Sequence, residues 1–384
     1  MNGFINFLFN FLKLLTCSVS YGYAVLRLYG YADYSETSVK AKRPYNHINL
    51  KPKKLKLEKL QFFISRTARG MRMPLAAVLM LLLHSAAMQA QTREEWKKME
   101  GDLTFFMAND LGRNGYYDQK PIAELMGEMA DIIGPECVIA AGDVHHFNGV
   151  ASVDDPLWMT NYEQIYSHPE LMIDWFPVLG NHEYRGNTQA VMDYSKKSRR
   201  WMSGQRYFTK VFNHEKTGMS LRIIFIDTTP LIQKYRTETC TYPDAVMQDK
   251  EAQLAWIDSL LAKADEDWVI VVGHHPIYAE TSKDADERDD MQKSLLPIFR
   301  RHPKVDVYAC GHIHNFQHIR QQGDPVDYIV NSSASLARKV KPIEGTVFCS
   351  PEDGFSVISA TKHHLIIYMM DKAGNILHTI DRQK

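Results

Sequence analysis

Four short hydrophobic runs in this chain end in the same way, with a glycine followed by a residue type that binds metal ions. Their small and β-branched residues predict buried strands. Binding sites in α/β proteins lie beyond the carboxyl ends of such strands, so the polar residues that follow them are expected to meet at one sheet edge. The four runs and the residues that follow them are 138–141 before Gly142-Asp143, 175–179 before Gly180-Asn181-His182, 268–272 before Gly273-His274, and 305–310 before Gly311-His312-Ile313-His314.

The order of strand-like and helix-like segments after residue 94 predicts an α/β protein. A first strand at 103–108, a helix at 121–133 and the strand at 138 have the rhythm of a βαβ unit. We expect two β-sheets packed face to face with helices outside, a four-layer α/β/β/α sandwich that forms one domain over residues 91–384. The other expected helices are 161–167, 189–198 and 248–264, and the other expected strands are 207–212, 221–226, 316–321, 328–331, 355–360, 364–370 and 376–380.

The segment 71–90 has the design of a secretory signal peptide: a short basic start, an apolar centre and small residues at its end. It predicts export, to the periplasm or outside the cell. We interpret residues 1–70 as an upstream extension without a folded role, with translation starting at Met71 or Met73. The alternative is a membrane-proximal basic anchor, because five lysines lie within 51–59.

The distribution of charge and cysteine excludes two classes of site. Residues 91–384 hold 32 Lys and Arg against 42 Asp and Glu, a balance of about −10 that argues against nucleic-acid binding. The five cysteines have no CxxC spacing, so a thiolate metal site is not expected. Cys240 and Cys349 lie in loop-like sequence and could pair in an oxidising compartment. We expect no stable membrane insertion of the mature domain, and the sequence leaves the oligomeric state open.

The polar residues that follow the predicted strands form one candidate metal site. Carboxylate oxygens, an amide oxygen and imidazole nitrogens together suit Mn, Fe or Zn. Two divalent ions about 3.5 to 4 Å apart need a bridging ligand, and a carboxylate has the two oxygens for it. The candidates are Asp110, Asp143, His146, Asn181, His182, His274, His312 and His314.

In this order, the motifs resemble the five-block signature of calcineurin-like metallophosphoesterases. The first block has the form D-x-G, which is similar to purple acid phosphatases of the small tartrate-resistant type. The likeness covers residues 101–380. Its blocks are Asp110-Leu111-Gly112, Gly142-Asp143-Val144-His145-His146, Gly180-Asn181-His182-Glu183, Gly273-His274-His275-Pro276 and Gly311-His312-Ile313-His314.

The resemblance implies two metal ions and a role for each strand-end residue. His182 would face the substrate with Asn181 and would protonate the leaving oxygen, while a metal-bound hydroxide attacks phosphorus in line. The implied metal ligands are Asp110 and His314 on the first ion, Asn181, His274 and His312 on the second, and Asp143 bridging both.

Two positions depart from the family pattern. His146 stands where purple acid phosphatases carry the tyrosine that gives them their colour, so we expect a colourless enzyme in which His146 can still bind the first ion. Lys283 stands where the tartrate-resistant type has a substrate-facing histidine, and a lysine there holds phosphate as a point charge. His145, Glu183 and His275 are left as supporting residues, and Tyr116, Tyr117 and Tyr184 as pocket-mouth or packing aromatics.

These observations predict an exported dinuclear phosphatase that hydrolyses small phosphomonoesters. A phosphodiesterase or pyrophosphate-bond hydrolase could use the same site. The alternative outside this class is a non-catalytic phosphate- or metal-binding protein, in which the altered first-metal ligands no longer support turnover.

Overall fold

The computed structural model describes residues 92–384, and the expected upstream extension and signal peptide lie outside this range. Within the described range, no helix combines the length and the apolar character that crossing a membrane requires. Residues 92–97 are helical and precede the first strand. Two β-sheets and five further α-helices follow.

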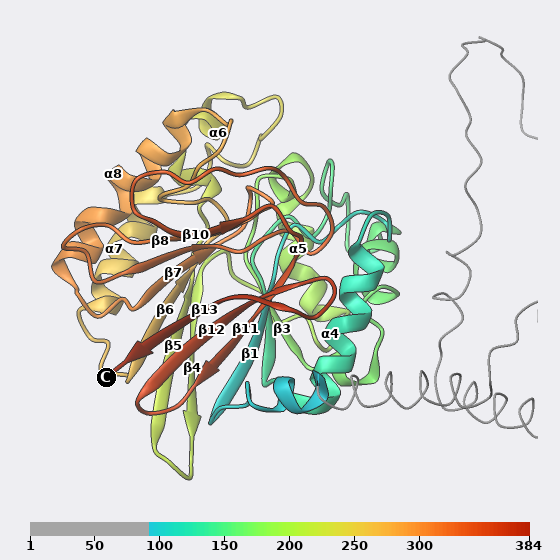
Figure 1. Ribbon diagram of the computed structural model, residues 1–384. Coiled ribbons are helices and arrows are strands. Elements are labelled where there is room, and N and C mark those ends of the chain that lie inside the picture. The colour runs from blue at the N-terminus through green and yellow to red at the C-terminus, as the bar shows by residue number, and fades with distance from the viewer. Residues whose placement is uncertain (1–91) are drawn as a thin grey trace, which may run out of the picture. The chain divides into compact units, whose positions relative to one another are not determined.

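The first sheet has six strands, and one half of it is parallel (Figure 1). Strands β1, β2 and β3 run parallel, whereas β11, β12 and β13 continue the sheet from β1 in antiparallel pairs. In spatial order, the strands are β13 (Ile376–Gln383), β12 (His364–Asp371), β11 (Gly354–Ala360), β1 (Leu103–Ala108), β2 (Cys137–Ala140) and β3 (Asp174–Pro177).

The second sheet has seven strands and a parallel centre of its own. Strands β5, β6, β7 and β9 run parallel, and β4, β8 and β10 are antiparallel to their neighbours. In spatial order, the strands are β10 (Thr346–Ser350), β8 (Phe316–Ile319), β9 (Asp327–Val330), β7 (Val307–Cys310), β6 (Trp268–Val272), β5 (Met219–Phe225) and β4 (Phe208–His214).

Successive side chains of the central strands point to opposite faces of their sheet, so the buried residues form two clusters, one between the sheets and one that includes helix residues. Phe105 and Ile139 join Ile270 in a buried cluster made of residues from both sheets. Their chain neighbours Phe106 and Val138 point the other way and pack with residues of helix α4. Figure 1 shows α4 (Gln119–Ile133) beside the first sheet, and α7 (Lys250–Leu261) and α8 (Ala285–Arg301) beside the second. The expected two-sheet α/β fold with flanking helices is therefore confirmed.

Short helical segments lie in the loops between these elements. The α-helices among them are α5 (Thr188–Asp193) and α6 (Gln233–Thr237). The others are single turns: Pro169–Leu171, Glu183–Arg185, Tyr194–Lys196 and Thr229–Leu231 are 3₁₀-helical, and Met159–Glu163 is a π-helix.

Some sequence-based expectations about the elements were wrong. The segment 161–167 is not a regular helix, because its first residues belong to the π-helical turn. Helix α8 and strand β10 were not expected; α8 is rich in charge and contains Pro297, which obscures its apolar spacing. Cys240 and Cys349 do not pair, since all four cysteines within residues 92–384 are free.

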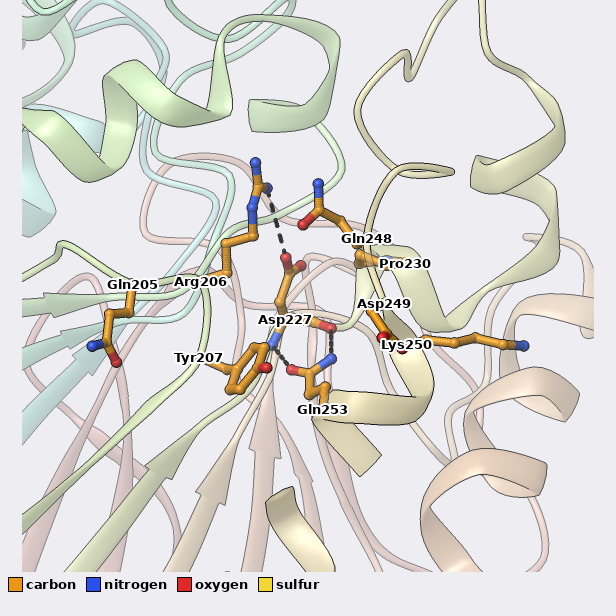
Figure 2. Close-up of a pocket in the computed structure, with 9 residues that line it drawn as sticks. All are labelled: Gln205, Arg206, Tyr207, Asp227, Pro230, Gln248, Asp249, Lys250 and Gln253. Carbon is orange, nitrogen blue, oxygen red and sulfur yellow. Dashed lines mark hydrogen bonds and ion pairs between the residues drawn. The ribbon is translucent and has the colours of Figure 1, made fainter. Parts of the chain in front are cut away.

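A buried carboxylate anchors the loop that follows β5 (Figure 2). Gln253 of α7 donates to the backbone oxygen of Asp227 at 2.9 Å and accepts from its backbone nitrogen at 2.8 Å. The Asp227 side chain accepts a hydrogen bond from the Tyr184 hydroxyl, and its other oxygen has no hydrogen-bond partner. Burial raises the pKa of Asp227 to about 7, although Tyr184 and Arg206 act in the opposite direction.

We predict that Asp227 makes the protein less stable as pH rises. Its folded pKa of about 7 exceeds the unfolded value of about 3.9, so the folded state binds the extra proton between these values. The free energy of unfolding therefore falls as pH rises from about 4 to about 7. The pKa difference between the two states limits this fall to at most about 4 kcal/mol. Asp227→Asn should gain stability relative to the native chain between pH 5 and pH 7.5, measured by urea denaturation.

Asp249→Asn is the matched control, because this exposed residue lines the same pocket and asparagine can still accept the Ala252 N–H at the start of α7. The prediction would be contradicted if the free energy of unfolding of Asp227→Asn differed from that of the native chain by the same amount at pH 5 and at pH 7.5.

Candidate metal centre

The candidate site lies where the parallel strands of both sheets end. Asp110 follows β1, Asp143 follows β2, and His312 and His314 follow β7. All four residues have positive φ, between 51° and 72°, a conformation that costs a non-glycine residue roughly 1–2 kcal/mol. Such strained residues cluster at functional sites, where the surrounding structure holds them in place.

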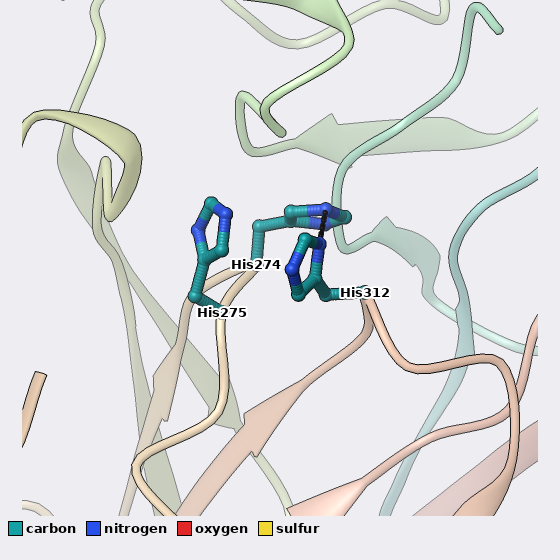
Figure 3. A group of neighbouring side chains, drawn as sticks. All are labelled: His274, His275 and His312. Atoms are coloured by element: carbon teal, nitrogen blue, oxygen red, sulfur yellow. Dashed lines mark hydrogen bonds between the residues drawn. The ribbon is translucent and has the colours of Figure 1, made fainter. Parts of the chain in front are cut away.

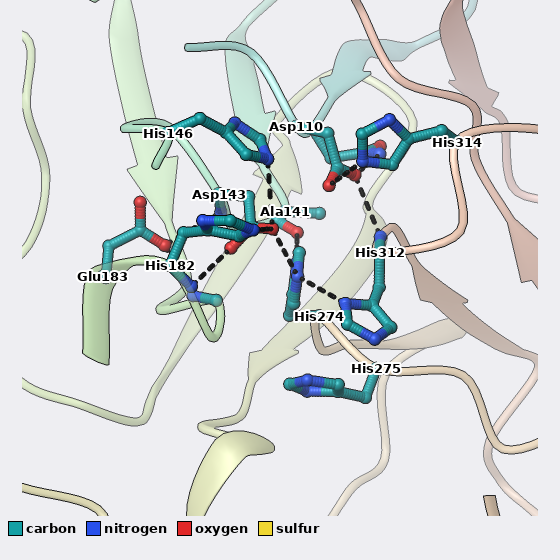
Figure 4. Close-up of polar contacts among 12 residues, drawn as sticks. Asp110, Ala141, Asp143, His146, His182, Glu183, His274, His275, His312 and His314 are labelled. Carbon is teal, nitrogen blue, oxygen red and sulfur yellow. Dashed lines mark hydrogen bonds and ion pairs between the residues drawn. The ribbon is translucent and has the colours of Figure 1, made fainter. Parts of the chain in front are cut away.

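One group of side chains brings together Asp110, His146 and His314 (Figure 4). The ligand atoms of these three buried residues all lie within 4.8 Å of one another. The Nε2 atom of His314 is 3.0 Å from Oδ1 of Asp110, and Nε2 of His146 is 3.5 Å from Oδ2 of Asp143. His146 thus lies beside the carboxylates, as a first-ion ligand would.

A second group lies on the other side of Asp143 and contains His274 and His312 (Figure 3). Nε2 of His274 is 3.2 Å from Oδ2 of Asp143 and also 3.2 Å from Nδ1 of His312. The neighbouring His275 forms a hydrogen bond between Nδ1 and the Thr228 hydroxyl, and its ring packs on that of His312. Burial lowers the pKa of His275 well below its usual value, so this ring is neutral.

Several buried polar atoms of these groups lack the hydrogen bonds that native proteins almost always supply. Oδ1 of Asp110, both ring nitrogens of His146 and Oδ1 of Asn181 have no hydrogen-bond partner among residues 92–384. Each of these residues offers an oxygen or nitrogen atom of the kind that Mn, Fe and Zn bind. The residues present therefore fit a metal centre.

Backbone carbonyls orient the histidines. Nδ1 of His274 lies 2.9 Å from the Ala141 oxygen, and Nδ1 of His314 lies 3.0 Å from the Leu336 oxygen. Each contact places the ring hydrogen on Nδ1 and leaves Nε2 facing the carboxylates. Partners of this kind are typical of histidines that bind metal ions.

Glu183 holds the loops that follow β2 and β3 together. Its buried carboxylate accepts the backbone N–H groups of Asp143 at 2.8 Å, His145 at 3.0 Å and Gly180 at 2.7 Å. The glycine is required at position 180, because a Cβ atom there would lie 2.2 Å from Oδ1 of Asp143. The supporting role expected for Glu183 therefore has a structural basis.

The two aspartates remain ionised although they are buried. Burial raises the pKa of Asp110, but His314 and His274 outweigh it and hold that pKa well below its usual range. Asp143 behaves in the same way under the influence of His274 and His182. Burial lowers the pKa of His274, but Asp143 overcomes this effect and raises it to about 9. Two ionised carboxylates in one buried site attract cations.

The remaining candidates lie at the solvent side of these groups. His182 is half-buried; its Nε2 is 3.8 Å from Oδ2 of Asp143, and its Nδ1 is 2.6 Å from the Phe147 oxygen. Lys283 places Nζ 2.7 Å from Nε2 of His312, and burial lowers its pKa to about 8. Asn181 and Lys283 line one cavity of about 230 Å³ together with Arg185, Lys234, Tyr235, Tyr242, Asp284 and Glu287.

The structure decides one alternative that the sequence left open and adds one residue that was not expected. Of the two alternatives for the aromatic residues, Tyr184 has the packing role, because it is fully buried beside Asp227, whereas Tyr116 and Tyr117 are exposed beside the site. Glu287 contacts His312 at 3.1 Å and was not anticipated, because it belongs to the unexpected helix α8. An acidic residue four positions after Lys283 was the only signal for it in the sequence.

Comparison with known proteins agrees with this geometry. Residues 103–316 match the family model described as calcineurin-like phosphoesterase. Purple acid phosphatase 7 of Arabidopsis thaliana is 32% identical over 294 residues, covering 73% of this chain and 86% of that protein. Human tartrate-resistant acid phosphatase type 5 is 28% identical over 217 residues, covering 56% and 66%.

Solved structures share the fold. GAP50, the anchor in the inner membrane complex of Plasmodium, matches with a TM-score of 0.61 and 21% identity over 73% of this chain and 88% of that one. A dimetal phosphatase from Danio rerio matches with a TM-score of 0.52 and 13% identity over 74% and 99%. The chain belongs to the calcineurin-like phosphoesterase family and, within it, to the purple acid phosphatases. It is a metal-dependent phosphoric ester hydrolase.

Proposed function

We propose that this chain is an exported phosphatase that uses two metal ions to hydrolyse small phosphomonoesters. The observation that carries the proposal is the position of Asp143 between the two groups of ligands. Its Oδ2 atom is 3.5 Å from Nε2 of His146 on one side and 3.2 Å from Nε2 of His274 on the other. One carboxylate in this position can bridge two ions.

In this proposal, each ion has four protein ligands. When bound, the two ions neutralise the phosphoryl oxygens and supply the hydroxide that attacks phosphorus. Fe, Mn and Zn all suit the oxygen and nitrogen ligands. The proposed ligands are Asp110, Asp143, His146 and His314 for the first ion, and Asp143, Asn181, His274 and His312 for the second.

His182 is proposed to protonate the leaving oxygen, which favours turnover at acid pH. Phe147 accepts the Nδ1 hydrogen of His182, so the ring can give a proton from Nε2 only in its doubly protonated form. Burial lowers the pKa of His182 to about 4, although Asp143 acts in the opposite direction. A lower pH therefore raises the fraction of His182 that is doubly protonated and able to donate.

Positive charge beside the second group supports a phosphomonoester as the substrate. Lys283 and Arg185 line the same cavity as Asn181 and can contact the non-bridging phosphoryl oxygens of a dianion. A diester carries one negative charge fewer on its phosphate. Export is proposed from the signal-peptide pattern of residues 71–90.

The experiment that tests this function uses chelated protein reconstituted with Fe, Mn or Zn. We expect hydrolysis of a chromogenic phosphomonoester to exceed that of the matching diester, and Asp143→Asn to lower kcat/KM by more than about a hundredfold because the bridge is lost. Asp131→Asn is the control, since this exposed residue pairs with Arg93 on the surface, away from the site. Turnover of neither substrate with any metal would favour the non-catalytic binding protein instead.

A second prediction concerns colour and rests on His146. The native protein loaded with ferric iron should show no strong visible charge-transfer band, because imidazole replaces phenolate at this position. His146→Tyr should acquire such a band, measured by visible absorption of the iron-loaded variant. His145→Tyr is unsuitable as a control because that ring packs against Trp158, so His363→Tyr at an exposed position serves instead. A coloured native protein would refute the proposed role of His146.

A further inference from the structure

Glu287 is a buried carboxylate beside the proposed second ion, and the proposed function gives it no role. It lies in the first turn of α8 and is only 3% exposed. Oε1 of Glu287 accepts from Lys234 at 2.9 Å and from the Tyr235 hydroxyl at 3.1 Å. Oε2 lies 3.1 Å from Nε2 of His312. Both carboxylate oxygens therefore have partners, and Oε2 contacts a proposed metal ligand.

The contact with Glu287 decides which nitrogen of His312 is free. A neutral imidazole has one N–H group, and a carboxylate can only accept a hydrogen bond. Glu287 therefore places the hydrogen on Nε2 and leaves Nδ1 with its lone pair. Nδ1 faces Nε2 of His274 at 3.2 Å, and the Nδ1 hydrogen of His274 is directed at the Ala141 oxygen. Two nitrogens at this distance need a proton or a metal ion between them, so a metal ion that binds here replaces the proton on Nε2 of His274.

Lys283 acts on the same ring in the opposite sense. Its ammonium group can only donate, and Nζ lies 2.7 Å from Nε2 and 3.1 Å from Nδ1 of His312. The shorter contact, to Nε2, needs a bare Nε2 and so moves the ring hydrogen to Nδ1, where it blocks the metal position. A hydrogen bond to Nδ1 would occupy the metal position itself. Glu287 and Lys283 therefore select different tautomers of His312.

We propose that Glu287 is a positioning residue that holds His312 in the tautomer able to bind the second metal ion, against the competing hydrogen bond from Lys283. This inference rests on the proposed dinuclear site. In this inference, Glu287 does not contact the substrate. Outer partners of metal-binding histidines typically change metal affinity about ten- to a hundredfold.

The test is a titration of the chelated full-length protein with Zn²⁺, followed by calorimetry. Glu287→Ala should weaken the second binding event about ten- to a hundredfold and leave the first nearly unchanged. Glu287→Gln should recover part of the loss, because its amide oxygen still accepts from Nε2. Adding Lys283→Met to Glu287→Ala should also restore affinity, since it removes the competing donor.

Asp284→Asn is the matched control, because Asp284 pairs with the same Lys234 at 3.4 Å and directly precedes α8. Equal affinity of Glu287→Ala and the native protein at both sites, or an equal loss in Glu287→Ala and Asp284→Asn, would overturn the inference. If the native protein binds only one ion, the dinuclear proposal fails. Glu287 is then judged by ¹⁵N NMR of the His312 ring, which must change tautomer in Glu287→Ala.

A separate observation concerns the substrate. Three large aromatic side chains beside the first group are exposed, Tyr116 by 72%, Tyr117 by 62% and Phe147 by 65%. Together with His146 and Arg113 they line a cavity of about 350 Å³. Exposed apolar side chains gathered in one place mark binding sites.

The position of Phe147 connects this cavity with the proposed proton donor. Its carbonyl oxygen holds Nδ1 of His182 at 2.6 Å, and its ring centre lies 6.2 Å from that of His182. A leaving oxygen protonated by His182 therefore carries its substituent past the Phe147 ring. The Arg113 guanidinium lies 5.0 Å from the centre of the same ring and closes one side of the cavity.

We infer that the cavity lined by Tyr116, Tyr117 and Phe147 binds an aromatic leaving group, which makes aromatic phosphomonoesters the favoured substrate class. This deepens the proposed function and depends on it. Aromatic pairs prefer stacked or edge-to-face contact, which the three exposed rings can offer to a substrate ring.

The test compares KM for phenyl phosphate and for glycerol phosphate. The double variant Tyr116→Ser/Tyr117→Ser should raise KM for phenyl phosphate about two- to tenfold more than KM for glycerol phosphate, because only the first substrate loses ring contacts. Phe147 is retained because its carbonyl holds His182. Met247→Ser removes an exposed apolar side chain outside the cavity and should leave the KM ratio unchanged.

An equal change for both substrates, or no change for either, would overturn the assignment. If the native protein hydrolyses neither ester, the proposed function fails, and the cavity is tested by calorimetric binding. Phenylphosphonate must then bind more tightly than methylphosphonate, and the double variant must abolish the difference.

Discussion

The structure depends on two buried carboxylates that remain ionised. Asp110 and Asp143 lie in a site from which water is largely excluded, where an isolated charge would be costly. Histidines from both sheets surround them and hold their pKa values below the usual range. The backbone also contributes, since Asp110 accepts the N–H of His312 at 2.9 Å and Asp143 that of His182 at 2.9 Å. The fold thus places two negative charges at the carboxyl ends of the parallel strands, and the neighbouring histidines and backbone N–H groups stabilise them.

This arrangement explains why the site residues stand at strand ends. A parallel strand delivers its last residues to the same edge as its neighbours, so residues far apart in sequence meet without long loops. Close approach then requires glycines. A Cβ at Gly142 would lie 2.3 Å from Nδ1 of His274, and one at Gly311 would lie 2.7 Å from Oδ2 of Asp110. The repeated glycine before each polar residue is therefore a packing requirement of the site.

The same regularity made the fold and most of the site predictable from sequence. Buried strands of β-branched residues ending in Gly-Asp or Gly-His leave few alternatives, and the strand-end residues do converge. The contacts of Glu287 and Lys283 with His312 could not be predicted, because Glu287 lies in α8 and Lys283 in the loop before it, and the charged residues and Pro297 of α8 obscure its apolar spacing. For Tyr184 the sequence left a pocket-mouth and a packing position open, because its burial depends on Asp227, which is distant in sequence. Tertiary contacts of this kind leave no local pattern.

The division of the site between the two sheets has a mechanical consequence. Asp110, Asp143 and Asn181 extend from the first sheet, whereas His274, His312 and His314 extend from the second. In the proposed centre, each ion takes ligands from both sheets and so cross-links the two sheets of the sandwich. Sliding of one sheet along the other would alter the distances at both ions together. The rigidity of the inter-sheet core would then set how sharply the centre discriminates between metals.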